Sequence, residues 1–530
     1  MTLVACSPDA SNTTDSAATQ MLVIATAADA DALLPPLVAT TAGKQVMDVL
    51  FEHLADPKDA TLRTDGDAGF VPRLASGWTW ATDSLSIAFT LNDKARWHDG
   101  QPVTSADVRL SYELYTDPKV GSIHASGFSG IDSVTTPDAR TAVVWWHARH
   151  PEQFFQVAYN LAIMPAHVLR DVPRDSLRSA PAASNPVGSG PYRFASWERK
   201  RQLVLTADST HYQGTPTFGR VVWTILPDAA TAAKAVFAGQ AAVIEVLRGE
   251  AAAEAARTPS VRLVEYGALD YGYMAFNLGA SRRGRVSFAD RALRAALSSA
   301  VNRDAIVANA LDSLGRVALG PFTRTSSVAD TTVGAIGYDT TRASQVLDSL
   351  GWRLAPGDSV RRRNGQPLRF SILFPTTSGT RRRLAVLLQE QYARIGVGVD
   401  VDGVEPPVFA QRLQKGDFDA VLNAWRDDPS PVGIRQAWGT PSKDQMGANF
   451  GGYSNRAFDA LVDSAATQFN GATRQALMRR AHRLIVEDAP ALWLYEPRNI
   501  AAVRSDIEPT GVRPDAWLGN VAHWKVSPSR

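Results

Sequence analysis

Hydrophobic and polar residues alternate most clearly over residues 85–91, where Leu85, Ile87, Phe89 and Leu91 are apolar at every second position. This period of two predicts a strand with one buried face. A continuous apolar run over 21–27 predicts an earlier, fully buried strand. Between the two, helical spacing predicts a helix over 44–54, with its apolar positions at Val46, Val49, Leu50 and Leu54.

A turn and a helix are predicted directly after the strand over 85–91. Asp99-Gly100, followed closely by a proline, marks the turn. Thr104 is suited to N-cap a helix, with Asp107 at the third helical position as in a capping box. His98 lies beside Asp99, and we expect the two to stabilise the turn rather than to act as a catalytic dyad. No residue of this block is therefore assigned to chemistry.

Length and charge limit the classes of protein that fit. A chain of 530 residues exceeds what one core usually supports, so two to four domains or lobes are expected. The net charge is only +2, from 55 basic and 53 acidic residues, and this argues against a nucleic-acid partner. No run of 18 apolar residues occurs, so no membrane-spanning helix is predicted.

Signatures of catalysis and of metal binding are missing from the sequence. There is no dinucleotide fingerprint, P-loop, H-E-x-x-H or G-x-S-x-G motif. His147 and His150 are three apart, but a predicted strand over 143–146 leads into them, so they should point to opposite faces. We expect no catalytic residue, no metal ligand and no cofactor. The arginine clusters at 361–363 and 381–383 are predicted to be solvated, the first before an Asn-Gly turn and the second at the start of a helix.

Seven blocks, in order along most of the chain, resemble the family 5 extracellular solute-binding proteins, the peptide- and nickel-type receptors of ABC importers. The first runs from Leu74 and Trp78 through the alternating strand to Trp97-His98-Asp99-Gly100-Gln101-Pro102 and Thr104-Ser105-Ala106-Asp107-Val108. The others are Met164-Pro165-Ala166-His167, Pro186-Val187-Gly188-Ser189-Gly190-Pro191-Tyr192, Tyr273-Met274-Ala275-Phe276-Asn277 with the following Asp290-Arg291-Ala292-Leu293, Val301-Asn302-Arg303-Asp304-Ala305-Ile306, Asn449-Phe450-Gly451-Gly452-Tyr453, and Glu487-Asp488-Ala489-Pro490.

The resemblance implies an α/β fold of the periplasmic-binding-protein type II, in which two lobes close like a clam shell. An extra subdomain would be inserted in the first lobe. Carried onto this chain, lobe I comprises 21–57, 185–268 and 500–530, the inserted subdomain 58–184 and lobe II 269–499. Independently of the resemblance, 179–185 with its proline predicts a loop at the end of the subdomain. Crossing strands near 267–273 and 493–501 would form the hinge.

The resemblance also implies where a ligand is held. Peptide-binding relatives use a Trp-x-x-Asp segment whose aspartate pairs with the ligand's α-ammonium, and here Trp425 precedes Asp427 and Asp428. Either aspartate fits this role, because the segment is compressed relative to the family, or Asp428 only caps the turn at the next proline. Nearby Arg435 could hold a peptide's carboxylate and Trp438 an apolar side chain. A surface salt bridge is the alternative for Arg435.

Cys6 is the only cysteine, and it follows Leu3-Val4-Ala5, which resembles a bacterial lipobox. A lone thiol makes no intrachain disulfide. Residues 7–20 are rich in small and polar residues and predict a flexible tether after the anchor point. We therefore expect lipidation at Cys6, with the protein held at the membrane in the periplasm or cell envelope.

These observations leave three functions in competition. The first is a monomeric, lipid-anchored receptor that passes a peptide-like solute to ABC permease subunits. The second keeps the fold but binds a nickel chelate, haem, a sugar or an opine. The third, a hydrolytic enzyme on a two-lobed scaffold, lacks any visible nucleophile and base.

Overall fold

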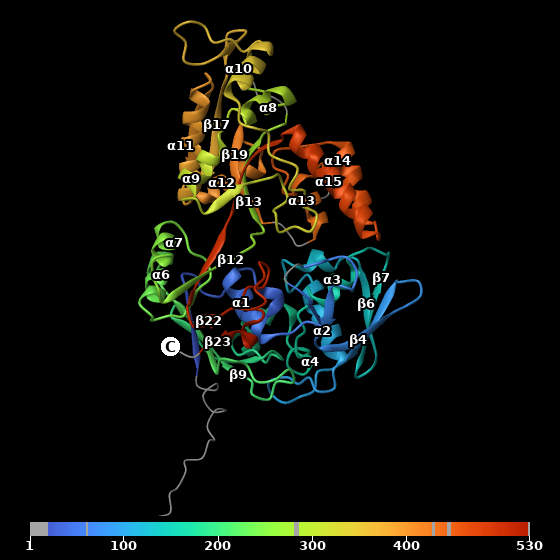
Figure 1. Cartoon of the computed structure of the whole chain (residues 1–530). Coiled ribbons are helices and arrows are strands. Elements are labelled where there is room, and N and C mark those ends of the chain that lie inside the picture. The colour runs from blue at the N-terminus through green and yellow to red at the C-terminus, as the bar shows by residue number, and fades with distance from the viewer. Residues whose placement is uncertain (1–19, 60–61, 280–285, 427–429, 442–446, 528–530) are drawn as a thin grey trace, which may run out of the picture.

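A computed structural model describes residues 20–59, 62–279, 286–426, 430–441 and 447–527. The chain forms two lobes, one above the other in Figure 1, each built around its own large sheet. The chain passes from the sheet of one lobe to that of the other at 267–269, and it returns at Arg498. This is the two-lobed α/β architecture that the sequence predicted.

Lobe I, the lower body in Figure 1, contains a seven-stranded sheet in the order β12-β21-β11-β1-β10-β9-β8. Strand β1 pairs in parallel with β10 and β11, and the remaining pairs are antiparallel. The elements of this lobe are β1 (Met21–Thr26), η2 (Pro35–Leu37), α1 (Thr41–Leu50), β8 (Tyr192–Glu198), β9 (Gln202–Ala207), β10 (Arg220–Ile225), α6 (Ala229–Phe237), β11 (Val243–Ile244), α7 (Glu250–Ala255), β12 (Val261–Tyr266), β21 (Asn499–Arg504), η6 (Val521–His523) and the small ladder of β22 (Ile507–Glu508) with β23 (Lys525–Val526).

A subdomain with a four-stranded antiparallel sheet, β4-β5-β7-β6, packs beside lobe I and shares its main hydrophobic core. Its elements are β2 (Ala55–Pro57), β3 (Phe70–Pro72), β4 (Ala75–Trp80), β5 (Ser86–Leu91), α2 (Ser105–Thr116), η3 (Ala125–Phe128), β6 (Ile131–Asp138), β7 (Thr141–Trp146), α3 (Gln153–Ala158), α4 (Ala166–Leu169), η4 (Arg174–Ser179) and α5 (Pro181–Ser184). The predicted loop over 179–185 therefore contains one helical turn, α5, which begins with a proline, a residue suited to the first helical position.

Lobe II, the upper body in Figure 1, contains a six-stranded mixed sheet in the order β14-β20-β13-β19-β17-β18. Met274 and Phe276 of β13 enter one hydrophobic core, while Tyr271 and Tyr273 enter another, because neighbouring side chains of a strand point to opposite faces. The elements are β13 (Asp270–Phe276), α8 (Arg291–Ser299), α9 (Arg303–Ala310), β14 (Gly315–Val317), α10 (Thr340–Ser349), the ladder of β15 (Arg362–Arg363) and β16 (Gln366–Pro367), β17 (Arg369–Pro375), α11 (Gly379–Ala393), β18 (Gly398–Val404), α12 (Pro406–Gln414), β19 (Ala420–Arg426), η5 (Pro431–Gly433), α13 (Ile434–Trp438), α14 (Arg456–Ala466), α15 (Gly471–Asp488) and β20 (Ala491–Pro497).

The strongest local patterns of the sequence are confirmed. Strand β5 buries Ile87, Phe89 and Leu91 completely, and β1 lies where the first apolar run predicted it. Helix α2 begins at Ser105, and the Asp107 carboxylate accepts hydrogen bonds from both the backbone N–H and the hydroxyl of Thr104, as in a capping box.

The predicted helix over 44–54 has different ends in the structure. Helix α1 begins at Thr41, one turn earlier, where Thr40 caps it by accepting a hydrogen bond from the backbone of Gly43. It ends at Leu50 because Phe51 has an extended backbone conformation (φ −120°, ψ 149°). Leu54 is buried, but in the connection that leads to β2.

The expected pairing of His98 with Asp99 is wrong. The His98 ring instead accepts a hydrogen bond at Nδ1 from the backbone N–H of Gly188 (3.1 Å) and contacts the Gly190 carbonyl through Nε2 (2.9 Å). Asp99 pairs with His167 at 2.6 Å. A Cβ on Gly188 would lie 1.9 Å from the Leu50 carbonyl oxygen, so only glycine allows this approach. His98 thus ties the subdomain to the loop through which the chain re-enters lobe I.

The expectation that the cluster at 361–363 is solvated is also wrong for its first member. Arg361 is buried, and its guanidinium donates to the carbonyls of Ile395 (2.7 Å) and Trp352 (2.9 Å) and to Asp348 (2.8 Å). Arg362 and Arg363 are exposed, as expected. The buried guanidinium satisfies one backbone carbonyl just after α11 and another just after α10, and the first of these lies 34 residues away in the sequence.

Buried histidines make folding stability depend on pH. Burial lowers the pKa of His98 and of His482 from 6.5 to about 4. The unfolded chain therefore takes up these protons first as the pH falls, so stability is full above about pH 6.5 and is lost toward pH 4. We expect urea unfolding at pH 5 to give a lower free energy than at pH 7, by about 2 kcal/mol for each such imidazole.

Two variants identify the source of this effect. His482→Gln should reduce the difference between pH 5 and pH 7, whereas replacement of the exposed His147 by glutamine should leave it unchanged. An unaltered difference in His482→Gln would contradict the assignment.

Candidate ligand-binding site

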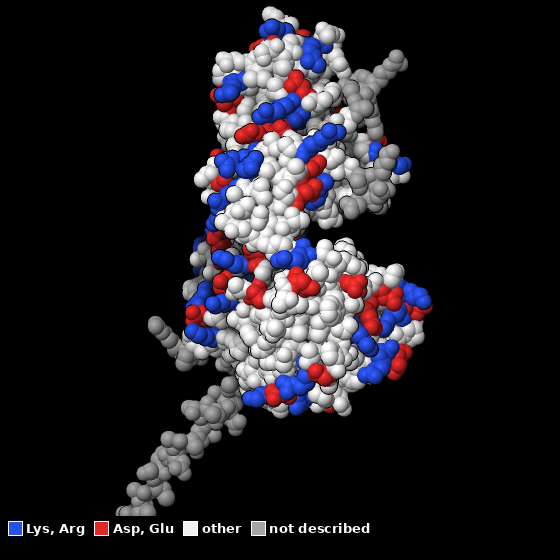
Figure 2. Space-filling view, turned by 90° about the vertical axis from the view of Figure 1, so that its right-hand side faces the viewer, with Lys and Arg blue, Asp and Glu red and all other residues white. Residues whose placement is uncertain are grey.

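A recess separates the two lobes, and Figure 2 shows it opening at the right-hand side of that view. Lobe II reaches this boundary with the end of β19 and the beginning of β13, where Trp425 pairs with Tyr271 and Arg426 with Asp270. Trp425 is partly buried and packs against the core on one face of the sheet. The predicted ligand segment therefore begins on a strand whose end points toward the opposite lobe.

Arg426 bridges the two lobes at this boundary. Its guanidinium lies 3.4 Å from the Asp270 carboxylate in lobe II and donates to the Pro514 carbonyl of lobe I at 3.3 Å. The side chain is 54% exposed, so part of its five N–H donors remains open to water. Such a group can bind a carboxylate or a carbonyl oxygen of a solute held between the lobes.

Carboxylates with raised pKa values lie on both sides of Arg426. Burial raises the pKa of Glu245 in lobe I and that of Asp270 in lobe II. Glu245 accepts hydrogen bonds from the Tyr266 hydroxyl (3.0 Å) and from the Gln45 amide. The nearby guanidinium of Arg426 opposes the effect of burial on Glu245. A carboxylate removed from water in this way is a strong partner for a cationic group.

Trp438 lies inside lobe II, where aromatic rings surround it. It is 3% exposed, its indole N–H donates to the Tyr271 hydroxyl (2.9 Å), and its ring centroid lies 4.8 Å from that of Trp493 and 5.2 Å from that of Tyr273. Trp438 and Tyr273, together with Phe450, line a concavity of about 10 Å³, room for about one water molecule. This is smaller than the roughly 300–1,000 Å³ of typical ligand pockets.

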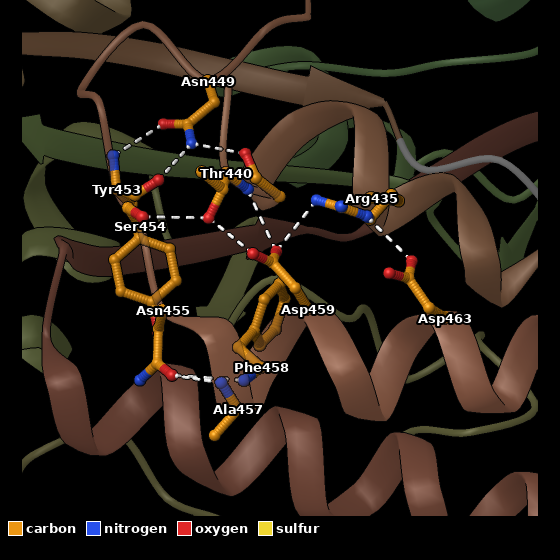
Figure 3. Close-up of polar contacts among 11 residues, drawn as sticks. Arg435, Thr440, Asn449, Tyr453, Ser454, Asn455, Ala457, Phe458, Asp459 and Asp463 are labelled. Carbon is orange, nitrogen blue, oxygen red and sulfur yellow. Dashed lines mark hydrogen bonds and ion pairs between the residues drawn. The ribbon is translucent and has the colours of Figure 1, made fainter. Parts of the chain in front are cut away.

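Arg435 is engaged in ion pairs within lobe II (Figure 3). Its Nη1 lies 2.8 Å from Asp459 and its Nε 2.9 Å from Asp463. Asp459 also accepts a hydrogen bond from the backbone N–H of Thr440 at 3.0 Å. The structure thus shows the salt bridge that was the alternative for this residue, and a contact with a ligand carboxylate stays a prediction.

The loop beside the concavity is fixed by Asn449. Its amide donates to the carbonyls of Gly439 and Tyr453, both at 2.8 Å, and its oxygen accepts from the Tyr453 backbone N–H at 3.0 Å (Figure 3). Asn455 then caps α14 by accepting from the backbone N–H groups of Ala457 and Phe458. The polar residues of this sequence block therefore hold the loop and the helix in place.

Three predicted residues lie outside the described residues. These are Asp427 and Asp428, the candidates for the ligand's ammonium group, and Cys6, the predicted lipidation site. Their roles stay predictions.

The contacts around Arg426 were not foreseen from the sequence. Gln45, Glu245, Tyr266 and Pro514 come from four separate parts of the chain, and none carries a local motif. Only the fold brings them to the boundary opposite β19.

Among the described residues, no group of three or more histidine, cysteine, aspartate or glutamate side chains is arranged to hold a metal ion. In that same part of the chain, no helix is long and apolar enough to cross a membrane.

Comparison with known proteins agrees with this architecture. The oligopeptide-binding protein AppA of Bacillus subtilis is 26% identical over 447 residues, which make up 83% of this chain and 80% of AppA. The structure of AppA in complex with a nonapeptide covers 96% of this chain and 100% of that one, with a TM-score of 0.76 and 23% identity. NikA from Brucella suis in complex with Fe(III)-EDTA has the same coverage, a TM-score of 0.81 and 18% identity.

The fold and these similarities define a clam-shell binding protein, with two lobes and a subdomain inserted in the first. The family model for bacterial extracellular solute-binding proteins, family 5 Middle, matches residues 69–445, well over half of the chain. The chain belongs to this family.

Trp438 provides a test of whether the aromatic cluster is structural. Trp438→Phe keeps a ring against Tyr273 and Trp493 but removes the hydrogen bond to Tyr271. We expect the free energy of unfolding to fall by about 0.5–1.5 kcal/mol, since the buried Tyr271 hydroxyl loses this hydrogen bond. Thermal unfolding should show this in protein stripped of solute, and a variant as stable as the wild type would contradict it.

Proposed function

We propose that this protein is the solute-binding receptor of an ABC importer, and that it captures a peptide-like solute between its lobes for delivery to permease subunits. The observation that carries the proposal is the two-lobed fold of a solute-binding family with a recess at the lobe boundary. The peptide class is supported by the similarity to AppA, which is named as an oligopeptide-binding protein. The receptor acts as a monomer and performs no covalent chemistry.

Capture requires contacts from both lobes, because a solute favours closure only by binding the closed form more tightly. On lobe II, Trp425 offers an aromatic face, and Asp427 or Asp428 would pair with the peptide's α-ammonium. Arg426 is suited to meet a carboxylate or a backbone carbonyl of the peptide, since it already donates to the Pro514 carbonyl. Lobe I contributes carboxylates such as Glu245 on the facing side.

Short peptides test this proposal directly. We expect di- to pentapeptides added to the stripped protein to change its tryptophan fluorescence and to raise its melting temperature. Trp425→Ala should weaken the affinity for a responding peptide about tenfold, while Trp145→Ala, on an exposed position of β7, should leave it unchanged. The absence of any response across such a library would contradict a peptide ligand.

The compressed segment between Trp425 and Pro429 supports a second candidate, the same receptor with a non-peptide solute. A nickel chelate, haem, a sugar or an opine would then occupy the same recess. Mass spectrometry of the solute that co-purifies with the protein from its native envelope distinguishes the two, since a peptide and each of these solutes differ in mass and fragmentation.

We further propose that Cys6 carries a lipid that ties the receptor to the membrane near its permease. Stable attachment needs more than one acyl chain, as in a cysteine that bears a diacylglyceryl group. Cys6→Ser in a full-length precursor should therefore move the protein from the membrane fraction to the soluble fraction, whereas Ser7→Ala should not. Retention of Cys6→Ser in the membrane fraction would contradict the anchor.

A further inference from the structure

The two lobes meet at a second place, away from the strands that connect them. The carboxylate of Glu152, just before α3 of the subdomain, accepts hydrogen bonds from Thr64 (2.9 Å) in its own subdomain and from Ser430 of lobe II (2.5 Å). It also forms an ion pair with Arg474 near the start of α15 in lobe II. Figure 1 shows this end of α15 reaching down to the subdomain. We call these four residues the interlobe latch.

Other contacts beside the interlobe latch also join the subdomain to lobe II. The Arg149 guanidinium of the subdomain lies 4.8 Å from the centroid of the Phe469 ring in lobe II. Gly471, the first residue of α15, comes so close to the subdomain that a Cβ there would lie 3.0 Å from the Asp65 carboxylate. Two stretches of the subdomain, at 65 and at 149–152, therefore touch two stretches of lobe II, at 430 and at 469–474.

The ion pair of the interlobe latch is largely buried, so the loss of one partner has a large free-energy cost. The side chain of Arg474 is 4% exposed and that of Glu152 15%. Removal of one partner of a buried ion pair leaves the other charge without water or counter-charge, which is strongly unfavourable. Rotation of the lobes about the crossings at 267–269 and Arg498 would separate the pair and return both groups to water. The cost of losing one partner therefore falls only on the arrangement in which the lobes touch through the latch.

We propose that the interlobe latch sets the balance between closed and open lobes before any solute arrives. Ser430 belongs to lobe II and follows the end of β19 by four residues in the sequence. Glu152 is thus a positioning residue that acts on the solute through lobe closure. The apparent affinity for a solute falls in proportion to the closed fraction. This role deepens the proposed receptor function and rests on it.

Lobe separation in the solute-free protein tests the latch without knowledge of the solute. Spin labels at Ile123 of the subdomain and Val386 of α11, which are 67% and 50% exposed, report the distance between the lobes in a Cys6→Ser background. We expect one dominant short distance in otherwise wild-type protein. Glu152→Ala should shift the ratio of closed to open molecules toward open by at least about tenfold and give a longer, broader distribution.

Two further variants separate the latch from general damage. Asp348→Asn removes the charged partner of the buried Arg361 within lobe II and should leave the distance unchanged. Arg474→Met added to Glu152→Ala removes the unpaired charge and should restore much of the short distance. If Glu152→Ala folds poorly, Ser430→Ala should shift the distribution in the same direction, to a smaller extent.

The results that would contradict the interlobe latch differ from those that would contradict the proposed function. A Glu152→Ala distribution identical to that of the wild type overturns the latch, as does a double variant that stays as open as Glu152→Ala. Failure of peptides to bind would overturn the peptide ligand and leave these distances unaffected.

Discussion

The two lobes have separate hydrophobic cores, and the part of the chain that the structure describes crosses between their sheets only twice. Within the described residues, every buried member of the lobe I cores comes from 22–255 or 501–524, and every buried member of the lobe II cores from 271–494. No shared core therefore locks the lobes together. This constraint allows the lobes to move as bodies about residues 267–269 and 498, as a receptor that closes on a solute requires.

Polar contacts join the lobes at several places. Arg426 donates to Pro514, Arg316 pairs with Glu265 at 3.0 Å, and Glu152 holds Ser430 and Arg474. When the lobes separate, water replaces these contacts. They therefore favour the closed arrangement but do not prevent opening. Polar interfaces of this kind are typical of domains that move relative to one another. The same polar character gives the recess groups that can bind charged ends of a solute.

The sequence predicted what depends on neighbours along the chain. The alternation of Ile87, Phe89 and Leu91 and the capping pair of Thr104 with Asp107 are local, and both are confirmed. The role of His98 was missed because its partners lie 90 and 92 residues away, and Arg361 because its carbonyl partners belong to other elements. The candidate site shows the same division. Trp425 and its segment were proposed from a motif, whereas Glu245, Pro514 and the residues of the interlobe latch come together only in the folded chain.

The central claim is that one solute is held between the lobes and contacts both. A crystal structure of the protein with the solute that co-purifies from its native envelope tests this most directly. We predict electron density for a peptide-like molecule at the end of β19, with contacts from Trp425 or Arg426 on lobe II and from the facing residues of lobe I. Density confined to the outer surface of a single lobe, with the recess filled only by water, would contradict the account.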